Sequence, residues 1–203
     1  MGFGLLLFGY MTLLGFFPDL FIYNGYGIFI AAGGGIINFA AYFKLQEYNI
    51  YFKIMKYISV AYILILCGFA PVLLIKRSDE FMYSFTYVSK IIRILFLFAY
   101  HYIMLCGIRG IAQSAGNIKI SKSAEFNIKF TYVYFGAAVL SIFDFMPLYY
   151  GLSVMLSGVI YYFKIIGNIH DCFVRITYKG HDEEAERKKL EKKLKKDKKD
   201  DEN

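Results

Sequence analysis

The feature that most constrains this chain is a succession of long apolar runs separated by short polar stretches. Apolar residue types make up 58% of the 203 residues, more than the roughly 45–50% of a soluble domain. A membrane-spanning helix needs about 20 mostly apolar residues, because the hydrocarbon core is about 30 Å thick. The runs therefore predict an all-α, polytopic transmembrane helix bundle. The mean hydropathy of +0.45 excludes a disordered chain as its main body.

Six runs have the length and composition of membrane spans, and we predict that they form three helical hairpins. Only residues 18–19 separate the first two runs and only residues 146–147 separate the last two, so each pair is expected to turn tightly. The fourth run contains Lys90, Arg93 and His101, which leaves five spans as the alternative. The predicted spans are residues 2–17, 20–43, 57–75, 86–108, 130–145 and 148–166.

Two longer stretches, residues 44–56 and 109–129, join these runs. Both mix lysines with apolar side chains, as a helix in the headgroup layer of a membrane does. The simpler interpretation, which we favour, is that both are ordinary connectors.

A change of composition near residue 180 divides the chain into a transmembrane domain, residues 1–179, and a charged tail, residues 180–203. From Asp182 onward the tail holds nine acidic and nine basic residues, so it is neutral. Pairs such as Glu183/Arg187 place the acid four residues before the base, which stabilises a helix. We expect a soluble, solvated C-terminal helix here. The net charge of +7 therefore belongs to the transmembrane domain.

The basic residues of that domain are divided unequally between the two sides of a six-span protein. One side holds both termini and ten of the fourteen basic residues. Positive residues accumulate on the cytoplasmic side of membrane proteins. We therefore expect both termini in the cytoplasm, a location in the plasma membrane, and anionic lipids against the cytoplasmic face.

Charged side chains inside a span are costly, and the fourth span has several on one side. At 100° per residue, Lys90, Arg93 and His101 share a stripe about 80° wide, which Leu97 interrupts. Such groups pair with one another or line a cavity, although snorkelling of the two long side chains to the headgroups is the simpler interpretation. With the two acids beside the outer hairpins, the candidate substrate- or ion-binding residues are Lys90, Arg93, His101, Asp19 and Asp144.

The second span has a different signal, a face of small residues that also bears one amide. Small residues let membrane helices approach closely, and an amide can hydrogen-bond across the contact. We predict that this face packs on another helix of the same chain, with a homodimer contact or a substrate contact as alternatives. Its helix-packing residues are Gly27, Ala31, Gly34, Gly35 and Asn38.

The sequence contains no recognisable catalytic or metal-binding motif, so we predict no metal and no cofactor. The three cysteines lack CxxC spacing. His170, Asp171 and Cys172 are consecutive and would point in different directions on a helix, so they cannot converge on one metal. Long apolar runs argue against a nucleic-acid partner. Whether the chain is an enzyme is left open, with the balance against it.

These features favour a non-catalytic membrane subunit, sensor or assembly factor, with a membrane-protein partner or a homo-oligomer as its assembly. The first alternative is a small transporter or channel with an outward-facing polar cavity between spans 1, 4 and 5. The second alternative is a membrane enzyme that acts on lipid.

Overall fold

The computed structural model describes residues 2–13, 26–74, 79–142 and 147–177, and all of the regular structure in these ranges is helical. The side chains of some residues within the helices, Thr86 and Arg93 among them, also lie outside the description. The described residues form six α-helices and one π-helical turn: α1 (Phe3–Leu13), α3 (Tyr26–Leu45), α4 (Ile50–Leu74), α5 (Asp79–Ser114), α6 (Ile118–Leu140), α7 (Leu148–Cys172) and the turn Phe173–Thr177.

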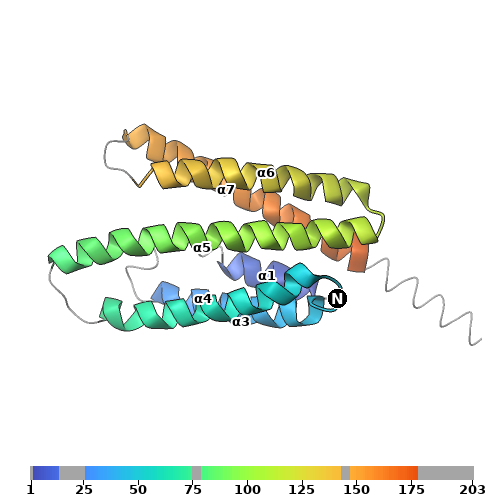
Figure 1. Cartoon of the computed structure of the whole chain (residues 1–203), viewed down its shortest axis with the longest axis horizontal. Coiled ribbons are helices and arrows are strands. Elements are labelled where there is room, and N and C mark those ends of the chain that lie inside the picture. The colour runs from blue at the N-terminus through green and yellow to red at the C-terminus, as the bar shows by residue number, and fades with distance from the viewer. Residues whose placement is uncertain (1, 14–25, 75–78, 143–146, 178–203) are drawn as a thin grey trace, which may run out of the picture.

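The helices lie along one long axis, and successive helices run in opposite directions (Figure 1). The N-terminus, the α3–α4 connection, the α5–α6 connection and the end of α7 therefore share one end of the bundle. Helix α1 contacts α3 and α7, while α4 contacts α3 and α5. Helix α6 packs against α5 and α7.

Three segments of the described helices are long and apolar enough to cross a membrane: Ile50–Gly68, Tyr87–Ser114 and Leu148–Ile176. The prediction of an all-α protein with membrane-spanning helices is confirmed to this extent. The count of six spans and their grouping into three hairpins stay predictions. The predicted soluble helix in residues 180–203 lies outside the described residues.

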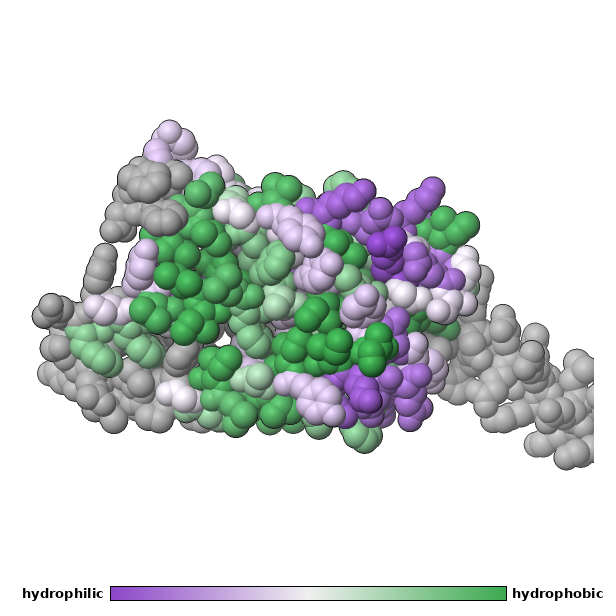
Figure 2. Space-filling view, in the orientation of Figure 1, coloured by the Kyte–Doolittle hydropathy of each residue, from purple (hydrophilic) through white to green (hydrophobic). Residues whose placement is uncertain are grey.

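Large apolar side chains remain exposed along the sides of the bundle, as expected for surfaces that face lipid. Leu64, Val133 and Leu156 expose about two-thirds of their area, at 66%, 67% and 66%. Figure 2 shows apolar residues over the length of the bundle and hydrophilic residues gathered at one end. Exposed apolar surface on this scale marks a membrane or protein contact.

The interpretation of residues 109–129 as an ordinary connector is wrong. Helix α5 continues to Ser114 and α6 starts at Ile118, so only three residues separate the two helices. Gly116, with φ of +67°, ends α5, and the amide of the next residue, Asn117, donates to the Ala112 carbonyl. The Asn117 side chain then accepts from the amide of Ile120 and begins α6. Both helices therefore extend beyond the apolar runs, because backbone hydrogen bonding continues a helix into water as well as through hydrocarbon.

Residues 44–56 are likewise mostly helical, since α3 ends at Leu45 and α4 begins at Ile50. The connection packs closely against α5. A Cβ at Gly107 would lie 2.9 Å from the Phe52 ring, and a Cβ at Gly110 would clash with the Asn49 amide. Two glycines of α5 therefore make room for the start of α4.

The small-residue face of α3 is buried where the structure describes it. Gly34, Gly35 and Asn38 are all buried, and a Cβ at Gly35 would lie 3.0 Å from Ile63 of α4. The side chains at residues 27 and 31 lie outside the described set. The tightest approach involves a glycine of α1, because a Cβ at Gly9 would clash with the Asn38 side-chain oxygen. Helix α1 thus packs on α3 through its own glycine.

A line of polar contacts joins α6 to α7. The Thr131 and Tyr161 hydroxyls lie 2.7 Å apart. About two turns away, the Ser123 hydroxyl donates to the Asn168 side chain over 2.7 Å. Interhelical hydrogen bonds of this kind hold membrane helices together and average about 0.6 kcal/mol each.

Candidate functional site around His101

His101 lies in the middle of α5 and exposes only 1% of its surface. Aromatic rings from three other helices surround its imidazole, with ring centroids 5.4–5.7 Å away. These rings belong to Tyr10 of α1, Phe135 of α6, and Tyr161 and Tyr162 of α7. His101 is therefore the point at which α1, α5, α6 and α7 meet.

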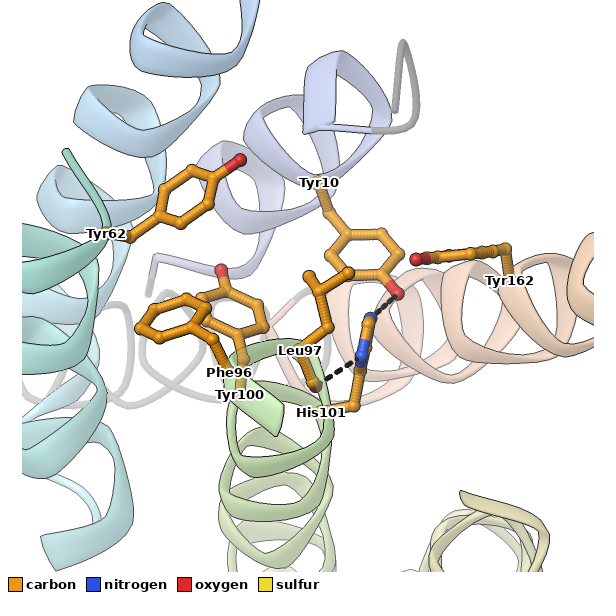
Figure 3. Close-up of a pocket in the computed structure, with 7 residues that line it drawn as sticks. All are labelled: Tyr10, Tyr62, Phe96, Leu97, Tyr100, His101 and Tyr162. Atoms are coloured by element: carbon orange, nitrogen blue, oxygen red, sulfur yellow. Dashed lines mark hydrogen bonds between the residues drawn. The ribbon is translucent and has the colours of Figure 1, made fainter. Parts of the chain in front are cut away.

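Both ring nitrogens of His101 are hydrogen-bonded. Nδ1 lies 2.7 Å from the Leu97 carbonyl oxygen, and Nε2 lies 2.6 Å from the Tyr10 hydroxyl (Figure 3). Because a carbonyl only accepts, Nδ1 carries a proton and donates it to Leu97. In the neutral ring Nε2 then accepts from Tyr10, so the two bonds fix the tautomer and the orientation of the ring.

A second buried polar group lies next to this pair, between α3, α4 and α5. The Tyr42 hydroxyl donates to the Tyr100 hydroxyl over 2.8 Å. Asn38 and Ser59 face the same Tyr100 hydroxyl, but neither side chain makes a hydrogen bond of ordinary geometry with a described residue. Asn38 thus adjoins Gly9 of α1 as well as Tyr100 of α5, and the expected hydrogen bond from Asn38 across to another helix stays a prediction.

A small cavity of about 20 Å³ lies beside His101, between α1, α4, α5 and α7 (Figure 3). This volume is close to that needed by a single water molecule. Sites that bind small molecules are usually about 300–1,000 Å³. The cavity is lined by Tyr10, Tyr62, Phe96, Leu97, Tyr100, His101 and Tyr162.

The predicted charged stripe is only partly described. His101 and Leu97 share the cavity wall, so the apolar side chain that interrupts the stripe is a direct neighbour of the imidazole. Lys90 is half-buried about two turns before Leu97, and no ion pair between described residues includes it. The side chain of Arg93, and both Asp19 and Asp144, lie outside the described residues.

The position of the cavity differs from the position that the sequence predicts for a polar cavity. The described cavity lies between the helices that correspond to spans 1, 3, 4 and 6. An outward-facing polar cavity between spans 1, 4 and 5 stays a prediction, because its proposed acids lie outside the described ranges.

Metal binding has no visible basis in the part of the chain that the structure describes. That part contains no group of three His, Cys, Asp or Glu residues placed to hold an ion. Within the consecutive His170, Asp171 and Cys172, the carboxylate of Asp171 instead pairs at 3.4 Å with Arg175, four residues later in the π-helical turn that follows α7.

Sequence reasoning selected His101 but missed its partners Tyr10, Tyr100 and Tyr162. The signal was weak, since tyrosine is common in this chain, at 19 residues, and is at home in apolar spans. Position along the chain was no guide, because Tyr10 and His101 are 91 residues apart.

A tyrosine–histidine hydrogen bond can exchange a proton when substrate or water reaches it. Here Tyr10 and His101 each expose 1% of their surface, and the adjoining space holds no more than a water-sized molecule. The Tyr10–His101 bond therefore ties α1 to α5 at the point where α6 and α7 also meet. Comparison of the chain with protein-family models, with curated proteins and with solved structures gives no match.

Proposed function

We propose that this protein is a non-catalytic integral membrane subunit, sensor or assembly factor that acts through a membrane-protein partner. The observation that carries the proposal is the filled centre of the bundle. Tyr10, Tyr42 and Tyr161 are among the largest fully buried side chains, and each exposes at most 1% of its surface. Together with His101 they fill the interior of the described bundle and leave beside them a cavity of only about 20 Å³.

The proposed topology has six spans, both termini in the cytoplasm, and a location in the plasma membrane. It is supported by the hydrophilic residues of the described chain that gather at the end of the bundle where α4 and α6 start and α7 ends (Figure 2). A cysteine introduced at Gly180 tests the orientation. It should react with an impermeant thiol reagent only after the cytoplasmic side is opened, and reaction in intact cells would overturn the topology.

The existence of a partner is tested by extracting the protein from its native membrane in a polymer-bounded lipid disc. The mass of the extracted complex is then measured. The chain has a mass of 23.5 kDa. We expect a particle that contains at least one different membrane protein in fixed proportion. Protein masses that occur only as multiples of 23.5 kDa would contradict a subunit role and leave a homo-oligomer.

A small transporter is the second candidate, favoured by one observation. Lys90, Leu97 and His101 lie along one side of α5, and Lys90 is half-buried inside the apolar segment Tyr87–Ser114. An intramembrane charge is costly and often marks an ion or substrate pathway. Purified protein in sealed liposomes should show no flux of protons, alkali ions or inorganic anions above that of empty liposomes. A flux that Lys90→Gln abolishes would make transport the better function.

A further inference from the structure

The basic end of the bundle has an excess of positive charge that its own carboxylates do not balance. We define it as the described residues within about three turns of the start of α4 or α6 and of the end of α3, α5 or α7. Three carboxylates lie there, Glu47, Glu125 and Asp171. Nine cations lie there: Lys44, Lys53, Lys56, Arg109, Lys119, Lys122, Lys129, Lys164 and Arg175.

Two of these carboxylates already have partners. Glu125 binds Lys129 at 3.4 Å and Arg109 at 3.7 Å. Asp171 binds Arg175 at 3.4 Å. The other six cations make no ion pair with any residue that the structure describes. The unpaired charge is therefore concentrated on the lysines.

Four of these lysines are at helix ends where positive charge is unfavourable. Lys53 and Lys56 lie in the first two turns of α4, and Lys119 and Lys122 lie in the first two turns of α6. Neither helix has an acidic residue in its first turn. A helix N-terminus has a partial positive charge, which favours anions and disfavours cations. An anion from outside the chain would relieve both the helix ends and the neighbouring lysines.

The surroundings of Lys56 indicate what kind of anion this is. Its ammonium lies 4.9 Å from the centroid of the Tyr57 ring and 5.6 Å from that of Phe43, and it donates to the Gln46 side chain over 2.8 Å. The two rings are 60% and 56% exposed. Lys53, one turn earlier on α4, faces the same side of the helix. This face therefore presents two cations beside two exposed aromatic rings.

Exposed rings and unpaired ammonium groups a few ångströms apart suit only one environment well. The rings gain from apolar surroundings, while the ammonium groups need water or phosphate, and the membrane interface offers both. The same pairing recurs on the other side of the bundle, where Lys164 lies 4.6 Å from the centroid of the exposed Phe126 ring.

We infer that the face formed by Lys53, Lys56, Phe43 and Tyr57 binds the phosphate of an anionic phospholipid headgroup. Lys56 is held in place by the rings and by Gln46, which leaves two of its N–H groups free to donate to a phosphate oxygen. The site does not depend on the proposed function, since a subunit and a transporter could both have it.

The test is native mass spectrometry of the full chain in detergent, with phosphatidylglycerol or phosphatidylcholine of identical acyl chains added. The test variant is Lys53→Gln/Lys56→Gln. The control variant Lys129→Gln/Arg175→Gln removes the same charge from two cations that already have carboxylate partners. Circular dichroism and size-exclusion chromatography establish that each variant is folded before binding is compared.

The wild type should prefer phosphatidylglycerol. The test variant should lose affinity for it by on the order of 10- to 30-fold, as expected for two lysines at an anionic surface, and Lys53→Arg/Lys56→Arg should retain the preference. The control should change by less than about threefold, because its cations are already neutralised. An equal loss in both Gln variants would mean that only net charge matters and would overturn the site. So would an unchanged test variant, or a wild type that binds phosphatidylcholine as tightly as phosphatidylglycerol.

Discussion

Replacing Tyr10 by Phe removes the one hydroxyl that bonds to Nε2 of His101. The bond measures 2.6 Å, and both residues are at most 1% exposed. The adjoining cavity of about 20 Å³ has room for a single water molecule, so at best one water replaces the lost donor. Leaving a buried acceptor unpaired costs about 1–3 kcal/mol in soluble proteins. Interhelical hydrogen bonds in membranes measure about 0.6 kcal/mol on average and about 1.7 at most. We expect Tyr10→Phe to lower the free energy of unfolding by about 1–1.5 kcal/mol.

The assay is reversible unfolding in mixed detergent micelles, followed by far-ultraviolet circular dichroism. Tyr149→Phe is the matched control, because Tyr149 is 72% exposed, and it should change the free energy by less than about 0.3 kcal/mol. Combining Tyr10→Phe with His101→Leu should give a coupling energy of at least about 0.6 kcal/mol, since removing both partners leaves no unpaired group. A neutral Tyr10→Phe, or additive effects in the cycle, would refute the role given to this hydrogen bond.

Two glycines give further predictions, each checked in the same unfolding assay. Gly9→Ala places a Cβ against Asn38 and only 2.9 Å from Ile37 Cγ2, so it should destabilise by about 1–3 kcal/mol. Gly136→Ala is its control, because nothing lies within 4 Å of a Cβ there, and it should be neutral or slightly stabilising; equal losses in the two would contradict the α1–α3 contact. Gly116→Ala should cost about 1 kcal/mol because of the φ of +67° at this turn, and an unchanged stability would contradict that backbone conformation.

The helical class of this chain was predictable because burying a backbone in lipid demands that its hydrogen bonds be made internally. The residues at which the helices end were not predictable from the apolar runs. Residues 109–129 are polar enough to lie outside the hydrocarbon, yet they belong mostly to α5 and α6. An apolar run marks the membrane boundary, whereas α5 ends beyond it, at the turn where Gly116 takes a positive φ. That glycine and the Asn117 cap were the available signals for the true turn.

His101 could be selected because a polar ring inside an apolar run must find a partner. Its hydrogen-bond partner Tyr10 could not be selected, because nothing in the sequence indicates that α1 packs against α5. Leu97, which interrupts the polar stripe in the sequence, lies directly beside His101 in the structure. Its carbonyl and its side chain both adjoin the imidazole, so one apolar residue helps to close the space beside His101.

Access of water to the centre of the bundle is the most direct test of the proposal that the centre is a closed packed core. A single cysteine in place of Leu97, in a chain whose Cys67, Cys106 and Cys172 are replaced by Ala, reports on the cavity wall itself. Treated in native membranes from both sides with a charged maleimide, it should stay unmodified until detergent unfolds the protein, while a cysteine in place of the exposed Lys122 should react quickly. Comparable reaction of both cysteines in the intact membrane would show a water-filled passage beside His101 and contradict the closed core.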